Sequence, residues 1–293
     1  MNVFRVCSLV SLVWLLVACS DPAPETASPS PAQTDTAPAA LDENQALATD
    51  DAPSCQYTLG FQAWEPYQYI AVGHEVSGLD IEIARAVMAD MGCVLETRQS
   101  TWRDLLSLLR DGEIDFVLGA SKTDARHAYA LFSDAYRTEQ FALFIRLRDS
   151  QKFHIDSVAD FIDKGNVLGV VNEYYYGEAI SEALVRGDEN GHVRGAIMSE
   201  LNIARLLDGE IDGFLEDELV ATSMIRRKGL QLDIEQHELI LPSSDVYVMF
   251  SRAAVNDDDV TAFNTSLAAI RANGTYAKIL ERYYSKANLP AMR

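Results

Sequence analysis

Short apolar segments of strand length alternate with segments of helical periodicity from Cys55 almost to the end of the chain. This alternation constrains the fold most, because strands separated by helices pair in parallel and need helices on both faces of their sheet. The sequence therefore predicts an α/β fold. The predicted strands are 56–61, 94–97, 114–118, 141–147, 167–171, 211–215 and 247–251, and the predicted helices are 80–91, 102–110, 177–185, 203–207, 219–226, 260–271 and 276–284.

One unit of this alternation occurs twice. A leucine-rich helix, a glycine turn and an apolar strand follow one another over 108–118 and again over 206–215. Glycine is common between a helix and the next strand, which would explain the repeated unit. The repeat also fits two similar α/β lobes. Because parallel α/β sheets bind ligands at the carboxyl ends of their strands, the residues after each unit are the candidate site.

The two candidate segments carry opposite charges. The first unit leads into 119–126, which includes Ser121 and Arg126, and the second leads into Glu216 and Asp217. One lobe thus offers a cation with hydroxyl and amide donors, and the other offers carboxylates. A ligand that bridges them should carry both an anion and a cation, as an α-amino acid does.

Charge excludes two other classes of partner. The 293 residues contain 44 acids and 24 bases, for a net charge of −20. A nucleic-acid-binding protein needs a basic face that displaces counterions from phosphates, and docking on anionic lipid needs a polybasic surface. We expect neither activity.

The first 54 residues are expected to lie outside the fold. Residues 1–18 have one charge, Arg5, and an apolar run too short to span a bilayer, which is typical of a signal peptide. The run ends in Leu-Val-Ala-Cys, which resembles a bacterial lipobox and predicts lipidation of Cys19; an ordinary signal peptide with an incidental cysteine is the alternative. Residues 20–54 hold six of the nine prolines and seven acids but no Lys or Arg, so 19–54 is expected to be a lipidated cysteine and a disordered tether.

Two cysteines remain in the predicted domain, Cys55 and Cys93. A leftover pair in an exported chain favours a disulfide, and both residues precede predicted strands that would be parallel neighbours. Two reduced, buried thiols are the alternative.

Several stretches together resemble the bacterial extracellular solute-binding proteins that serve polar amino-acid ABC transporters. They are 78–84, 112–115, 119–126, 132–136 (Phe-Ser-Asp-Ala-Tyr) and 272–279 (Ala-Asn-Gly-Thr-Tyr-Ala-Lys-Ile). The resemblance implies a two-lobed periplasmic-binding-protein-like fold of type II, with a ligand cleft between the lobes and two crossover hinge strands. Lobe one would comprise 55–145 and 246–293, lobe two 146–245, and the crossings would lie at 144–146 and 245–248.

The resemblance also implies a set of ligand contacts. The arginine that matches Arg126 binds the ligand carboxylate through two N–H groups. A guanidinium suits this role because its N–H donors are parallel. Further donors match Gly119 and Ser121, and the acid that matches Asp217 takes the α-ammonium group. Aromatic residues that match Trp64 and Trp102 sandwich the ligand side chain, although Trp64 could instead be core and Trp102 a helix cap.

The stretch 172–177 (Asn-Glu-Tyr-Tyr-Tyr-Gly) departs from the family pattern, because tyrosine replaces the small hydroxyl donor there. Tyr175 is nevertheless expected to contact the ligand. Phe61 stands where several basic-amino-acid binders have Asp, which disfavours a Lys or Arg ligand. Three acids, Glu65, Glu173 and Glu216, could restore an acidic pocket.

The resulting hypothesis is a monomeric lipoprotein without enzymatic activity on the periplasmic or cell-surface face of a bacterial membrane. It would capture a polar α-amino acid, or a similar small carboxylate, and deliver it to a membrane permease without a cofactor. No metal site is expected, because the histidines lack ligand spacing and are predicted to be surface residues (His74, His127, His154, His192 and His237). The alternatives are a dehydratase-like enzyme that uses Glu173 or Glu216 as a general acid, and a ligand sensor without a transporter.

Overall fold

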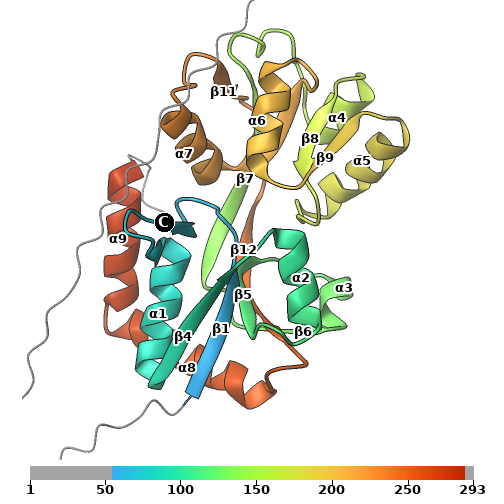
Figure 1. Cartoon of the computed structure of the whole chain (residues 1–293). Coiled ribbons are helices and arrows are strands. Elements are labelled where there is room, and N and C mark those ends of the chain that lie inside the picture. Colours follow the sequence, from blue (N-terminus) through green and yellow to red (C-terminus); the bar gives the residue numbers. More distant parts are fainter. Residues whose placement is uncertain (1–54, 288–293) are drawn as a thin grey trace, which may run out of the picture. The chain divides into compact units, whose positions relative to one another are not determined.

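The central feature of the fold is one long mixed sheet that continues through two α/β lobes (Figure 1). The computed structural model describes residues 55–287, which belong to one compact unit. The signal peptide, Cys19 and the tether that the sequence predicts therefore lie outside the described residues. No helix within 55–287 is both long enough and apolar enough to cross a membrane.

The lower lobe in Figure 1 carries the first strands of the sheet, with helices on either side of them. Its elements are β1 (Cys55–Phe61), β2 (Tyr69–Ile70), β3 (Val76–Ser77), α1 (Leu79–Met91), β4 (Cys93–Gln99), α2 (Trp102–Arg110), β5 (Phe116–Ala120), α3 (Asp124–His127), β6 (Ala130–Phe132), α8 (Asp257–Ala272) and α9 (Thr275–Ala287).

The upper lobe contains the remaining helices and strands, and two long strands, β7 (Arg137–Arg146) and β12 (Ser243–Ser251), run between the lobes. Its own elements are α4 (Val158–Asp163), β8 (Leu168–Val171), α5 (Glu178–Glu189), β9 (Val193–Ala196), α6 (Ser199–Leu207), β10 (Gly213–Asp217), α7 (Glu218–Lys228) and β11 (Ile234–Gln236).

The sheet has the strand order β4-β1-β5-β12-β7-β10-β8-β9. Parallel pairing, as predicted, joins β1 to β4 and β5 in one lobe and β8 to β9 and β10 in the other. The expectation of parallel sheets does not extend to the two connecting strands, because β7 and β12 pair antiparallel with each other and with their neighbours. The two-lobed fold with two crossover strands is thus confirmed.

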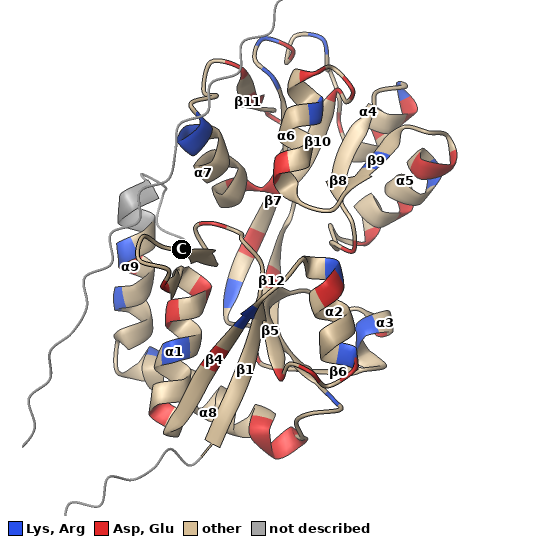
Figure 2. Ribbon diagram, viewed as in Figure 1, with Lys and Arg blue, Asp and Glu red and all other residues tan. Residues whose placement is uncertain are grey.

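The crossing in β7 lies earlier than the sequence predicts. Residues 137–140 of β7 pair with 243–246 of β12, whereas Phe144 and Ile145 pair with β10 inside the upper lobe. The apolar run 141–147 revealed only the apolar half of the strand. Its first half carries Arg137 and Glu139, so the hydrophobic pattern did not reveal it. Acidic and basic residues both lie on β7 (Figure 2).

The predicted disulfide is confirmed. Cys55 and Cys93 are register partners at the first residues of the parallel strands β1 and β4, their Cα atoms lie 4.6 Å apart, and their sulfur atoms are bonded. That Cα separation is within the usual range for a disulfide.

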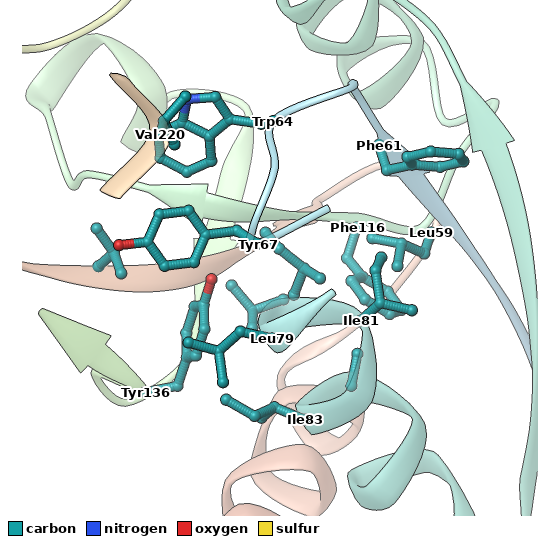
Figure 3. Packing of buried hydrophobic residues seen from close by; sticks show 14 of the residues in the cluster. Leu59, Phe61, Trp64, Tyr67, Leu79, Ile81, Ile83, Phe116, Tyr136 and Val220 are labelled. Atoms are coloured by element: carbon teal, nitrogen blue, oxygen red, sulfur yellow. The ribbon is translucent and has the colours of Figure 1, made fainter. Parts of the chain in front are cut away.

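Hydrophobic packing is continuous across the lobes. The largest cluster of buried side chains extends from β1 and α1 through Trp64 and Tyr67 to Val220 of α7 (Figure 3). A second cluster fills the upper lobe and a third lies beneath α2. The loop that contains Trp64 therefore joins the cores of both lobes.

One expectation about the histidines is wrong. His237 is 2% exposed, with Nε2 2.8 Å from the Phe153 carbonyl oxygen, and its Nδ1 accepts the Leu239 N–H. Its position just after β11 buries the ring, and both ring nitrogens have backbone partners. His74, His127 and His154 are exposed, and His192 is partly buried.

Candidate functional site

A cavity lies where most of the predicted site residues converge. It opens at the carboxyl ends of β1, β5 and β8, where parallel α/β sheets place ligands. Its lining comes from both lobes and comprises Gln62, Trp64, Gln68, Trp102, Leu118, Gly119, Ser121, Arg126, Glu139, Phe141, Tyr174 and Tyr175. Six of the seven predicted ligand contacts are among these residues.

Arg126 provides the cation of the cavity. The Thr123 hydroxyl caps the short helix α3 by accepting the Arg126 backbone N–H, and the side chain turns inward to leave the residue 7% exposed. Nη1 donates to the Ser121 carbonyl at 2.9 Å and Nη2 to the Glu173 carbonyl at 2.8 Å. Burial lowers the pKa of Arg126 from its ordinary value, so a partner with negative charge would stabilise this group.

Two tryptophans flank the cavity. Trp102 is the first residue of α2, and its Nε1 donates to the Glu173 carbonyl at 3.2 Å. The Arg126 guanidinium lies 5.6 Å from the Trp102 ring centre. Trp64 belongs to the buried core, as the alternative interpretation holds, and it also lines the cavity; its contact with a ligand stays a prediction.

The predicted donors after β5 are present, but they have intramolecular partners. The Gly119 N–H donates to the Tyr136 hydroxyl at 2.9 Å, and Ser121 Oγ lies 3.5 Å from a Glu139 carboxylate oxygen. Gly119 has φ +73°, and a Cβ there would approach the Trp64 ring to 3.1 Å. Glycine is therefore required at this point of the cavity wall.

Asp217 stands apart from the other predicted contacts. It is 1% exposed and does not line the cavity. One carboxylate oxygen caps α7 by accepting the N–H groups of Leu219 and Val220, and the other accepts the Tyr67 hydroxyl. Burial raises the pKa of Asp217 to about 6. Its role as the ammonium contact stays a prediction.

Two further buried acids lie close by. Glu139 is on the cavity wall, and burial raises its pKa to about 8. The carboxylate of Glu216 accepts Trp64 Nε1 and the Asp217 N–H, and burial raises its pKa to about 7. The buried cation Arg137 interacts with Glu139 and Asp217, and it forms two hydrogen bonds with Asp80, at 2.8 and 3.1 Å.

Sequence reasoning missed Glu139 and Tyr174 as cavity residues. An acid in a strand that is otherwise buried signals a polar environment, so Glu139 could have been found from the β7 sequence. Tyr174 had no such signal, because three tyrosines follow one another and the register of the loop decides which enters the cavity. The structure brings Tyr174 and Tyr175 into it and buries Tyr176 against Phe141.

The arrangement is suited to binding. It combines a buried guanidinium, aromatic walls and the carboxyl group of Glu139 in one cavity, and apolar walls with a few polar groups are typical of small-ligand sites. Within residues 55–287, no group of three or more His, Cys, Asp or Glu side chains is placed to hold a metal ion.

Comparison with known proteins places this cavity in context. The model of the bacterial extracellular solute-binding proteins, family 3, matches residues 57–286. A probable histidine-binding protein of Neisseria gonorrhoeae is 24% identical over 227 residues, which cover 75% of this chain and 80% of that protein. An ABC transporter arginine-binding protein of Escherichia coli is 25% identical, covering 75% and 87%. The L-cystine-binding protein TcyA of Bacillus subtilis is 23% identical, covering 76% and 78%.

Solved structures share the fold. A histidine kinase sensor domain similar to periplasmic binding proteins superposes with a TM-score of 0.67 at 18% identity, covering 77% of this chain and 94% of that one. The arginine-, lysine-, histidine-binding protein ArtJ of Geobacillus stearothermophilus gives 0.66 at 21% identity, covering 80% and 97%.

Proposed function

The chain belongs to the bacterial extracellular solute-binding proteins of family 3, and on that premise we propose that it captures a polar α-amino acid or a similarly small carboxylate. The observation that carries the proposal is Arg126, a guanidinium 7% exposed on the wall of the cavity. A buried cation is costly unless an anion faces it, and a ligand carboxylate matches the parallel donors of a guanidinium.

The remaining contacts follow from the cavity lining. The ligand carboxylate lies on Arg126, with Gly119 and Ser121 beside it, and the side chain lies between Trp64 and Trp102. Glu139 is the acid on the wall, and Asp217 reaches the α-ammonium group if the bond to Tyr67 opens. The names of the relatives support amino acids as the ligand class, since they specify histidine, arginine and cystine.

Closure of the two lobes around the ligand produces the conformation that the permease recognises. The two lobes, which β7 and β12 connect, each hold part of the site. A ligand that contacts both lobes favours the closed state through its higher affinity for it. The closed monomer then docks on the membrane permease of an ABC transporter, while the lipid on Cys19 and the tether over 20–54 hold it near the membrane.

The dehydratase alternative is less well supported. Its two candidate acids do not face the cavity as a general acid must: the Glu173 side chain is exposed, and Glu216 is held by Trp64 outside the lining. A binding role needs neither group as a catalyst.

A thermal-shift panel of the twenty L-amino acids on the purified protein tests the proposal. A ligand at 100 times its Kd stabilises by about 2.7 kcal/mol, which raises the melting temperature by roughly 5–10 °C in a domain of this size. Arg126→Ala removes the carboxylate partner and should abolish the shift, whereas Arg103→Ala, an exposed arginine on α2, should retain it. A full shift in Arg126→Ala would refute the carboxylate assignment.

A further inference from the structure

The loop between β8 and α5, residues 172–177, reaches across to the lower lobe and lines the cavity with its own groups. The Glu173 carbonyl accepts two N–H bonds from that lobe, one from Arg126 Nη2 at 2.8 Å and one from Trp102 Nε1 at 3.2 Å. This oxygen therefore sits on the guanidinium where the proposed function places a ligand carboxylate oxygen.

The next residue, Tyr174, packs against both tryptophans of the cavity wall; we call the space between Trp64 and Trp102 the aromatic slot. The Tyr174 ring centre lies 6.2 Å from that of Trp64 and 6.3 Å from that of Trp102, and its plane is edge-on to both indoles. Its hydroxyl accepts a bond from Gln62 Nε2. The ring packs against the hydrophobic clusters of both the upper lobe and α2. It thus stands between the two side chains that would sandwich a ligand side chain.

The backbone of the loop is held in an uncommon conformation. Glu173 has φ +66°, in the left-handed region that is unfavourable for an L-residue. The contacts of the carbonyl and of the adjacent ring offset that cost. Gly177, with φ +94°, ends the loop and is the N-cap residue of α5.

From these contacts we propose that Tyr174 is a specificity-determining residue that acts as a built-in competitor of the ligand. The loop places a carbonyl oxygen on Arg126 and an aromatic ring against both tryptophans, so it occupies the groups that a ligand would contact. A ligand binds by displacing both groups, so its affinity is reduced by the stability of the self-occupied state. This inference rests on the proposed function for the identity of the displaced subsites.

Tryptophan fluorescence reports on the slot directly. The chain has three tryptophans, and the two after Trp14 are the two that flank Tyr174. Without ligand, Tyr174→Ala should raise the acrylamide quenching constant, because both indoles lose a covering ring. Tyr247→Ala is the control, since this half-buried tyrosine packs against Phe132 and does not line the cavity, and it should leave quenching unchanged. Equal quenching in wild type and Tyr174→Ala would overturn the inference.

Calorimetry with L-arginine and L-histidine as probes tests the competition. Tyr174→Ala should bind the better of the two at least about tenfold more tightly than wild type, which corresponds to about 1.4 kcal/mol. Gln62→Ala, which removes only the bond to the tyrosine hydroxyl, should shift affinity less in the same direction. Weaker binding by Tyr174→Ala would make the ring a ligand contact and overturn the inference. If neither probe nor any amino acid in the thermal panel binds, the proposed function fails and the quenching comparison still decides the role of Tyr174.

Discussion

Three carboxyl groups, those of Glu139, Glu216 and Asp217, lie in the interior near the cavity, and burial raises the pKa of each. The raised values of about 8, 7 and 6 mean that the folded state retains protons that the unfolded chain has lost. Since desolvation penalises the charged form, these acids oppose folding once they ionise. A ligand cation in the cavity would relieve that penalty for Glu139.

This protonation predicts how stability depends on pH. From the ordinary carboxyl pKa of 4.5 up to about 8, the folded state binds more protons at Glu139 than the unfolded state, so the free energy of unfolding falls as pH rises. We expect the unliganded melting temperature to decrease between pH 5 and pH 8. Glu139→Gln keeps the shape without the titrating group and should weaken the decrease. Identical slopes for wild type and Glu139→Gln would show that Glu139 does not carry this effect.

At the scale of elements, long periodic segments were predictable and the connections between them were not. Helix α2 begins and ends where the sequence predicts, because Thr101 caps it and Leu105 and Leu109 repeat on one face. The helix α4 and the short strands β6, β9 and β11 were not expected, since each is too short to show a period.

The candidate site was also predictable only in part. Arg126, Ser121 and the tryptophans were placed by motif and lie together, whereas the contacts of Asp217 and Tyr174 depend on how the lobes meet. Pairing of distant residues, such as Asp217 with Tyr67 across 150 positions, has no local signature in the sequence.

The disulfide between β1 and β4 makes an element-scale prediction. It closes a loop of 38 residues, and removing such a crosslink costs about 2–4 kcal/mol through the greater freedom of the unfolded chain. Cys55→Ser with Cys93→Ser should lower the denaturation midpoint accordingly, and ligand affinity should persist because both residues lie at the strand ends away from the cavity. A midpoint in chemical denaturation equal to that of wild type would contradict this expectation.

At the scale of the whole molecule, a negatively charged chain is proposed to collect an anion-bearing ligand. The net charge of −20 acts at long range through a salt-screened field, whereas Arg126 acts at contact distance inside the cavity. We therefore propose that the buried guanidinium on the cavity wall, rather than the overall charge, selects the ligand. The two lobes contribute to this choice because they bring Trp102, Glu173 and Arg126 together.

The most direct test of that claim changes only the ligand carboxylate. The amino acid that gives the largest thermal shift is titrated into the purified protein by calorimetry, beside its C-terminal carboxamide, which keeps the side chain and the ammonium group. Charged hydrogen bonds contribute about 1.5–3 kcal/mol each, so loss of the carboxylate should weaken binding by roughly 100-fold or more. In Arg126→Ala the difference between the two ligands should vanish. Equal affinity of acid and amide for the wild-type protein would contradict the account.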